Sequence, residues 1–293
     1  MMAGNYQLVQ LASGENTLFS TAYGEKMHPG LGPSAEAELL YVRQLQIGER
    51  LRAERGEFVI WDVGLGGAAN AIAALRATSH ISGQLRLVSF DNTDEPLLFA
   101  LSHASALGYL AGYEVPVSEL LQNGVACFTN GAASVTWQFI RGEFPEFMKT
   151  GFADAKVAPP GPHAIFYDAF SPAKNPAMWT LPVFEDLFRR LGPARSCALT
   201  TYSRSTMIRA TLLLAGFFVG VGHATGMKEE TTIAANTLDL IAEPLGSRWL
   251  ERAGRSDSAE PLRIGAYARF ALSPTTRAAL SRHAQFKNKQ IVS

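Results

Sequence analysis

The stretch from Phe58 to Asp91 places the narrowest limits on the fold of this chain. Phe58–Val63 is an apolar run that suits a buried strand, and it leads directly into the glycine-rich turn 64–70. A helix is expected over 71–77, and a second apolar run, Leu85–Phe90, ends in Asp91. A strand, a glycine turn, a helix and a second strand ending in an acid form the nucleoside-binding unit of doubly wound α/β folds. The pattern therefore predicts a nucleotide or nucleoside cofactor at this turn.

Three glycines and two acids of this region are candidate cofactor contacts. Gly64, Gly66 and Gly67 allow the backbone to turn tightly and to approach a ligand without an intervening Cβ. Asp91 is placed to bond a ribose hydroxyl pair, or else to cap the helix expected over 95–107. Glu143 follows a further strand-like run, so we expect it either near the adenine side of a nucleotide or at the start of a helix.

A second candidate site follows the apolar run Ala164–Tyr167. The carboxylate of Asp168 comes next, and it opens a loop stiffened by prolines. In open α/β sheets, ligands bind beyond the carboxyl ends of the strands, where this loop would lie; the alternative is an ordinary connection between a strand and a helix. The candidate substrate-binding residues here are Phe170, Ser171, Pro172, Lys174, Asn175 and Trp179, with Tyr202 after the next strand.

The order of the elements predicts one variant of the doubly wound fold. Five strand–helix units precede two late strands, 217–221 and 231–235, and this matches the class I S-adenosylmethionine-dependent methyltransferase fold. We expect an α/β protein with a mostly parallel seven-stranded sheet closed by an antiparallel hairpin. The predicted parts are an N-terminal extension and helix (1–54), a methyltransferase core (55–245) and a basic C-terminal appendix (246–293). A Walker-type phosphate loop is absent from the sequence, which disfavours phosphate-cleaving chemistry.

Composition excludes several classes of protein. The formal net charge is zero, so no global field indicates nucleic acid or a membrane surface, although 247–293 carries nine Lys/Arg against three acids. That surplus marks either a solvated segment or a surface that faces a polyanion. Cys127 and Cys197 lie far apart among apolar residues, so we expect core positions and no metal site. A signal sequence and a membrane-spanning run are not found, which predicts a cytoplasmic protein.

Several motifs resemble those of the MnmC-type methyltransferase family, which acts in making 5-methylaminomethyl-2-thiouridine at the tRNA wobble position. The resemblance covers about residues 20–240 and is most specific around Asp168. The motifs that carry it are Tyr23-Gly24-Glu25-Lys26-Met27-His28, Val63–Asn70, Phe90-Asp91, Gly142-Glu143, Asp168–Pro176 with Met178-Trp179-Thr180, Thr201-Tyr202-Ser203 and Gly226-Met227-Lys228-Glu229.

The resemblance implies methyl transfer from S-adenosylmethionine to the amine of 5-aminomethyluridine in a tRNA anticodon loop. It implies cofactor contacts at the glycine turn, Asn70, Asp91, Glu143 and Asp168, and it makes Asp168 the catalytic residue as well. His28 and Lys228 become candidate substrate contacts. The flavin oxidase domain of bifunctional members has no room in this chain, so a separate oxidoreductase would supply the aminomethyl substrate.

Two departures from the family pattern keep other interpretations open. Ala68 replaces a glycine of the cofactor turn, and Met227 and Glu230 replace arginines near Lys228. The alternatives are a methyltransferase for another amine or small molecule, and a nucleoside-binding module without catalysis. A nicotinamide oxidoreductase is a further alternative, but such an enzyme would usually continue into a second nucleotide-binding half.

Overall fold

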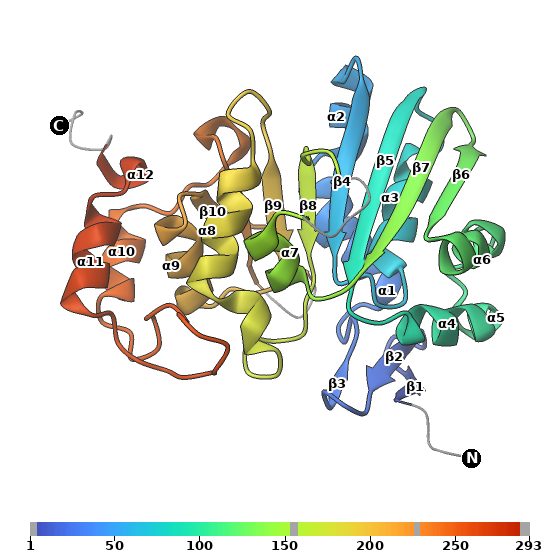
Figure 1. Ribbon diagram of the computed structural model, residues 1–293. Helices are drawn as coiled ribbons and strands as arrows, with labels where there is room; N and C mark the ends of the chain where they lie inside the picture. The colour runs from blue at the N-terminus through green and yellow to red at the C-terminus, as the bar shows by residue number, and fades with distance from the viewer. Residues whose placement is uncertain (1–4, 153–157, 226–228, 288–293) are drawn as a thin grey trace.

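The protein is organised around one eight-stranded sheet with the order β10-β11-β9-β8-β4-β5-β7-β6 (Figure 1). The structure is a computed structural model, and it describes residues 5–152, 158–225 and 229–287. The strands of this sheet are β4 (Glu57–Val63), β5 (Gly83–Asp91), β6 (Val125–Asn130), β7 (Ala133–Arg141), β8 (Ala164–Tyr167), β9 (Ala198–Thr201), β10 (Phe218–Gly222) and β11 (Thr231–Ala235).

The strand directions confirm the predicted fold class. Strands β4, β5, β7, β8 and β9 pair in parallel, whereas β11 is antiparallel to both β9 and β10. The sheet has eight strands rather than the expected seven, because Val125–Asn130 forms an extra edge strand antiparallel to β7. The order of the remaining strands is that of a class I methyltransferase.

Helices cover both faces of the sheet, and each face has its own apolar core. Alternate residues of β4 point to opposite faces, as the period of a strand requires. Phe58 and Ile60 join one cluster, while Val59, Trp61 and Val63 join the other. The helices between β4 and β11 are α3 (Ala69–Thr78), α4 (Glu95–Ser102), α5 (Ala104–Leu107), α6 (Glu114–Asn123), α7 (Phe144–Thr150), η2 (Pro176–Trp179), α8 (Leu181–Arg190) and α9 (Thr206–Leu214).

The N-terminal region contains three helical segments where the sequence predicted one helix within 1–54. These are α1 (Pro33–Ala37), the π-helix η1 (Glu38–Arg43), which follows α1 directly, and α2 (Ile47–Ala53), which begins after Gln46, whose φ is 51°. The wider π turn buries Leu40, Tyr41 and Val42, three consecutive residues that one face of an α-helix would not bury together. Before these helices, β1 (Tyr6–Gln10), β2 (Asn16–Ser20) and β3 (Glu25–Lys26) form a small antiparallel sheet within the predicted N-terminal extension.

The C-terminal residues also contribute to the core. After η3 (Leu238–Leu240), they form α10 (Ser247–Ala253), α11 (Pro274–Ser281) and α12 (Ala284–Lys287). Trp249 and Leu280 are buried in the same apolar cluster as α9, so this region packs against the sheet domain; the division of the chain into three parts remains a prediction. Across the described residues, no helix has the length and apolar character needed to cross a membrane.

Candidate active site

The carboxyl ends of three adjacent strands bring the predicted site residues together. In the register of the sheet, Val63 of β4 lies beside Phe90 of β5 and Tyr167 of β8. The residues that follow these positions therefore meet at one edge, which lies at the bottom of Figure 1. The Asp168 N–H donates to the Val63 carbonyl at 2.9 Å, and the Gly64 N–H donates to the Phe90 carbonyl at the same distance.

Two glycines of the turn, Gly64 and Gly67, are required by a close approach. A Cβ at Gly64, whose φ is 95°, would lie 2.7 Å from the carbonyl oxygen of Asp168. A Cβ at Gly67 would lie 2.6 Å from the hydroxyl of Tyr109, which donates to the Gly67 carbonyl. The Gly66 N–H donates to the carboxylate of Asp91 at 2.9 Å. These contacts fix the turn against both neighbouring strands.

Ala68 stands where the related family has glycine, and its backbone keeps the glycine conformation. Its φ is 66° and its ψ is 18°, a left-handed geometry that costs about 1–2 kcal/mol for a residue with a Cβ. The side chain is fully buried in the first apolar cluster and does not line either of the cavities described below. The extra methyl group therefore points away from the cavities and does not crowd them.

A small pocket of about 70 Å³ lies on one side of the glycine turn and is lined by Asp91, Asn92 and Glu143. Burial raises the pKa of Asp91 to about 6, although N–H groups that include those of Gly66 and Thr93 oppose that rise. The Asn92 side-chain amide donates to Glu143 at 3.0 Å. Glu143 also begins α7, so it occupies the helix start and the pocket wall at once.

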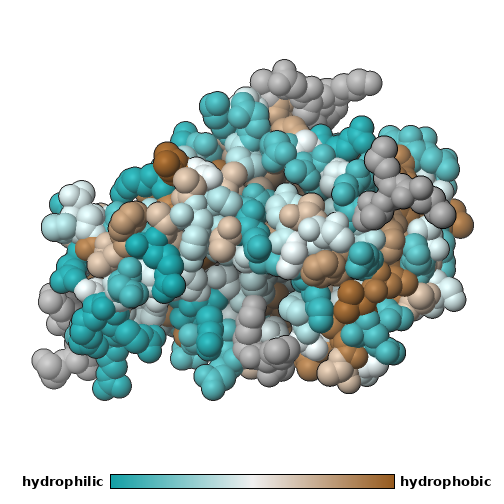
Figure 2. Space-filling model, turned by 90° about the horizontal axis from the view of Figure 1, so that it is seen from below, coloured by the Kyte–Doolittle hydropathy of each residue, from teal (hydrophilic) through white to brown (hydrophobic). Residues whose placement is uncertain are grey.

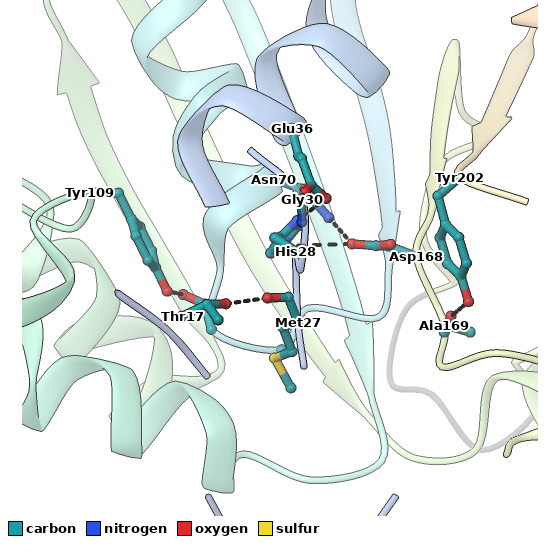
Figure 3. Close-up of polar contacts among 12 residues, drawn as sticks. Thr17, Met27, His28, Gly30, Glu36, Asn70, Tyr109, Asp168, Ala169 and Tyr202 are labelled. Atoms are coloured by element: carbon teal, nitrogen blue, oxygen red, sulfur yellow. Dashed lines mark hydrogen bonds and ion pairs between the residues drawn. The ribbon is translucent and has the colours of Figure 1, made fainter. Parts of the chain in front are cut away.

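A larger cavity of about 480 Å³ lies on the other side of the turn. In Figure 3, Asn70 and His28 converge on Asp168 from different elements. The Asn70 amide donates to the Asp168 carboxylate at 2.7 Å. His28 Nε2 lies 3.9 Å from the same carboxylate oxygen, while His28 Nδ1 lies 3.9 Å from Glu36. The Tyr202 hydroxyl donates to the Ala169 carbonyl at 3.0 Å on the opposite wall.

The wall of this cavity is rich in acidic groups. The carboxylates of Glu25, Glu36 and Asp168 line it, and Lys26 is the one lysine or arginine among the lining residues that the structure describes. Glu36 is held in place because it accepts hydrogen bonds from the backbone N–H groups of Gly30 and Leu31. Such a wall favours a cationic ligand over an anionic one.

Sequence reasoning missed two residues of this site, Glu36 and Tyr41. Tyr41 is fully buried in η1, and burial, followed by the charge of Asp168, raises the pKa of its phenol well above the usual value. Neither residue lies in the motifs that indicated a function. The available signal was the stretch Tyr23–His28, whose polar residues pack against the same cavity.

The loop after Asp168 is attached to the N-terminal sheet. The carboxylate of Glu25 accepts hydrogen bonds from both the backbone N–H and the hydroxyl of Ser171. The ring of Phe170 stacks on Tyr23 with centroids 4.1 Å apart. Asn175 lines the small pocket, whereas Pro172 and Lys174 lie outside the residues that line either cavity. Lys174 is exposed.

Trp179 supports this loop from inside the protein. The side chain is fully buried, its indole N–H donates to the Phe170 carbonyl at 2.8 Å, and Tyr167 and Tyr202 meet the ring edge-on. The predicted stacking of a base on Trp179 has no accessible ring face in this structure. Lys228 lies outside the described residues.

The site fits S-adenosylmethionine on two observations. The buried Oδ1 of Asn70 has no hydrogen-bond partner, so an ammonium or hydroxyl group in the cavity would satisfy it. The two cavities are adjacent, because five residues line both of them; these are Met27, Gly64, Gly66, Ala169 and Phe170. Within the described residues, no group of three or more His, Cys, Asp or Glu side chains is arranged to hold a metal ion.

Comparisons with known proteins agree with this geometry. A family model described as S-adenosyl-L-methionine-dependent methyltransferase matches residues 153–237, which include Asp168. The tRNA 5-methylaminomethyl-2-thiouridine biosynthesis bifunctional protein MnmC of Methylibium petroleiphilum is 29% identical over 255 residues, 83% of this chain and 36% of that protein. The protein of the same name from Burkholderia mallei is 29% identical over 213 residues, 69% of this chain and 31% of that protein. The chain thus spans about a third of the length of these relatives.

The crystal structure of MNMC2 from Aquifex aeolicus has the same fold. It superposes with a TM-score of 0.67 and 23% identity, and the match covers 97% of this chain and 86% of that one. The predicted resemblance to MnmC-type methyltransferases and the predicted class I fold are therefore confirmed. The enzyme class predicted from the sequence, an S-adenosylmethionine-dependent methyltransferase, is the one that the family model over residues 153–237 describes.

Proposed function

We propose that this protein transfers a methyl group to the aminomethyl nitrogen of a modified wobble uridine in tRNA, converting 5-aminomethyluridine to 5-methylaminomethyluridine. The observation that carries the proposal is the carboxylate of Asp168, held by Asn70 at the mouth of the glycine turn and facing an acid-lined cavity. The named activity of the MnmC relatives supports this acceptor over other amines.

We assign the cofactor to both cavities. The small pocket would hold the adenosine half, with Asp91 toward the ribose and Glu143 toward the adenine side. The backbone of Gly64, Gly66 and Gly67 would pass beneath the sulfonium and the amino acid half. Asn70 Oδ1 would accept a hydrogen bond from the α-ammonium group. When bound, S-adenosylmethionine supplies an electrophilic methyl group.

Asp168 would orient the acceptor amine. Methyl transfer forms an N–C bond and breaks an S–C bond, and the electron pair of the broken bond stays on sulfur. The acceptor nitrogen must therefore be neutral and in line with the methyl group, so positioning supplies much of the rate gain. A carboxylate that accepts an N–H hydrogen bond directs the lone pair of the nitrogen away from itself, toward the methyl group.

The acid-lined cavity would also admit the amine as its cation. An aminomethyl group carries a proton at neutral pH, and the carboxylates of Glu25, Glu36 and Asp168 would attract that charged form. The ammonium proton must leave before transfer. His28 lies 3.9 Å from both Asp168 and Glu36, so it would receive the proton from Asp168 and pass it toward Glu36 through a bridging water.

A small cationic amine is the second candidate acceptor, because the same acid-lined wall would attract it. For the tRNA acceptor, Phe170 and Tyr202 would contact a base turned out of the anticodon loop. Ser171, Pro172, Lys174, Asn175 and Lys228 would contact the flanking nucleotides. We further propose a cytoplasmic location and a separate oxidoreductase that supplies the aminomethyl group.

The test is incubation with labelled S-adenosylmethionine and tRNA from cells that lack this modification, followed by mass spectrometry of the nucleosides. Label in 5-methylaminomethyluridine is the expected result, and Asp168→Asn should abolish most of it. Label found only in small amines from an extract would replace the tRNA acceptor with the second candidate. Absence of label from both acceptors, with intact cofactor binding, would overturn the proposed acceptor and leave a binding module.

A further inference from the structure

Residues 263–270 form an exposed segment with an unusual composition for a protein surface. Its sequence is Arg-Ile-Gly-Ala-Tyr-Ala-Arg-Phe, so two arginines alternate with three large apolar side chains. Ile264, Tyr267 and Phe270 are 70%, 44% and 64% exposed. Among the Phe, Trp and Tyr side chains that the structure describes, Tyr267 and Phe270 are the two that are exposed, and the others are buried or half-buried.

The segment is held in a defined conformation. The Phe270 carbonyl accepts hydrogen bonds from the N–H groups of Ala259 and Glu260, both at 2.9 Å, which closes the loop at its base. The Glu260 carboxylate in turn accepts from the backbone N–H of Ser273 at 2.8 Å and from the hydroxyl of Thr276 at 2.7 Å. Exposure of the two rings is therefore built into an ordered loop.

The same segment lies against the loop that carries the candidate site. The Leu181 N–H donates to the Leu262 carbonyl at 2.7 Å. A Cβ at Gly265 would lie 3.5 Å from Ala177 in η2, and its neighbour Met178 lines the small pocket. The segment that carries the exposed rings thus lies beside the loop that follows Asp168, although it is about ninety residues further along the chain.

Charge indicates which kind of partner this surface fits. Residues 261–287 contain five Lys/Arg and no Asp or Glu. Arg263 lies 3.9 Å from Glu260, whereas Arg269 is exposed and makes no ion pair with any described residue. Seen from below in Figure 2, the carboxyl edge of the molecule mixes hydrophilic surface with isolated hydrophobic patches rather than showing one large apolar face. A polyanion with flat apolar groups matches this combination better than a protein surface does.

We infer that the segment 263–270 is a stacking platform for unpaired nucleotides of the RNA that carries the methyl acceptor. Aromatic rings beside arginines are the elements with which proteins bind single-stranded nucleic acid, since every base offers a face for stacking and every nucleotide a phosphate. The inference rests on the proposed function. It adds a site outside the cavities, which would hold the nucleotides next to the acceptor base.

The experiment measures the binding of a fluorescent RNA stem-loop, whose unpaired loop carries 5-aminomethyluridine, to the full chain by anisotropy. The fully paired duplex is the second probe. Tyr267→Ala and Phe270→Ala should each weaken binding of the stem-loop by roughly tenfold and leave binding of the duplex almost unchanged. Arg269→Gln should lower the slope of log affinity against log salt by about one. The control variants are Val115→Ala, which is exposed on α6, and Arg52→Gln, which is exposed on α2.

Methyl transfer to the isolated 5-aminomethyluridine nucleoside provides the second readout, and it should be the same in the platform variants and the parent. If the parent binds and methylates the stem-loop but the platform variants do so equally well, the inference is wrong and the proposed function stands. If the parent neither binds nor methylates RNA, the proposed function itself fails. If the variants instead abolish self-association in sedimentation and keep RNA affinity, the segment is a protein interface and the inference is overturned.

Discussion

The side-chain amide of Asn70, at the start of α3, donates a hydrogen bond of 2.7 Å to the carboxylate of Asp168, after β8. This bond joins the cofactor turn to the loop that would choose the acceptor. It also directs one oxygen of Asp168 into the cavity in a fixed orientation. In the proposed mechanism the glycine turn binds the cofactor and Asp168 orients the acceptor amine, and this contact holds the two in a fixed relation.

Asp168→Asn should separate these two roles. The substitution keeps the shape of the side chain but removes the negative charge that accepts the proton of the amine. We expect turnover to fall by about 100-fold, at the lower end of what a general base contributes, while the affinity for S-adenosylmethionine changes by less than about threefold. Steady-state kinetics and calorimetry of cofactor binding make the comparison, with the exposed Asp257→Asn as control. A loss of cofactor binding would assign Asp168 to the cofactor alone.

The affinity for the cofactor should depend on pH through Asp91. Its pKa is raised to about 6, so the carboxylate that would accept the ribose hydroxyls is protonated in more acidic solution. Between about pH 8 and pH 6 we expect nearly constant affinity, and below pH 6 a loss approaching tenfold per pH unit. Asp91→Asn should bind more weakly and with little dependence on pH. A parent profile that stays flat below pH 6 would remove Asp91 from the ribose site.

The hydrogen bonds from Ser171 to Glu25 should affect methyl transfer to the acceptor more than they affect the free energy of unfolding. Glu25→Ala removes both hydrogen bonds to Ser171, whereas Ser171→Ala removes only the one from the hydroxyl. Bonds to a charged group contribute about 1.5–3 kcal/mol each, so we expect kcat/KM for the acceptor to fall by tenfold or more in Glu25→Ala and by less in Ser171→Ala. The exposed Glu49→Gln is the control. Equal effects of the two variants would contradict this explanation.

Stability should decline as the pH rises toward 8 because of Asp62. This carboxyl is fully buried in β4, it accepts a hydrogen bond from the hydroxyl of Ser89, and burial raises its pKa to about 8. The folded protein retains a proton that the unfolded chain has lost, so the free energy of unfolding decreases as pH rises toward 8 and then levels off.

Two other titratable side chains, Asp91 and His163, limit the pH range in which unfolding reports on Asp62. Asp91, with a pKa near 6, acts in the same direction at lower pH, and His163, with a pKa lowered to about 4, acts in the opposite direction below about 6.5. Urea unfolding between about pH 6.5 and pH 8 therefore isolates Asp62. We expect a loss of about 1.4 kcal/mol per pH unit in the parent and a flat profile in Asp62→Asn. Parallel profiles would show that Asp62 is not protonated in the folded state.

Trp179 should behave as a core residue. Trp179→Ala removes a fully buried side chain, and we expect a loss of about 3–5 kcal/mol in the free energy of unfolding. Trp179→Phe keeps most of the volume and loses the hydrogen bond to the Phe170 carbonyl, so a smaller loss is expected. Chemical denaturation measures both. Reduced RNA binding by Trp179→Ala at unchanged stability would instead indicate a stacking role.

Local sequence patterns were sufficient to locate the ends of the strands and therefore much of the site. The glycine turn, Asp91 and Asp168 each follow an apolar run, and parallel strands bring such ends to one edge. The contact between Glu25 and Ser171 could not be predicted in this way, because it joins residues 146 positions apart through a short strand with no periodic signal. Local patterns also could not show that β6 is a separate edge strand that pairs antiparallel with β7.

Tertiary packing explains the other differences between the predicted site and the site in the structure. An aromatic residue after a functional motif suits a stacking contact and a core position equally well, and only the packing around Trp179 shows that its ring is enclosed. Tyr41 and Glu36 carry no motif of their own. The π turn that brings Tyr41 toward Asp168 depends on tertiary packing, which overrides the regular helical period expected for that stretch.

The stretch Tyr23–His28 contacts both cavities at once. Tyr23 and Met27 line the small pocket, while Glu25, Met27 and His28 line the large one. A ligand that orders Tyr23–His28 in one cavity therefore also orders the part of this stretch that lines the other cavity. The binding of the cofactor and the binding of the methyl acceptor would then be thermodynamically linked. By reciprocity, the factor by which bound cofactor tightens the acceptor must equal the factor by which bound acceptor tightens the cofactor. The demethylated cofactor would contact the same stretch, so its affinity would differ between protein with the acceptor bound and protein without it.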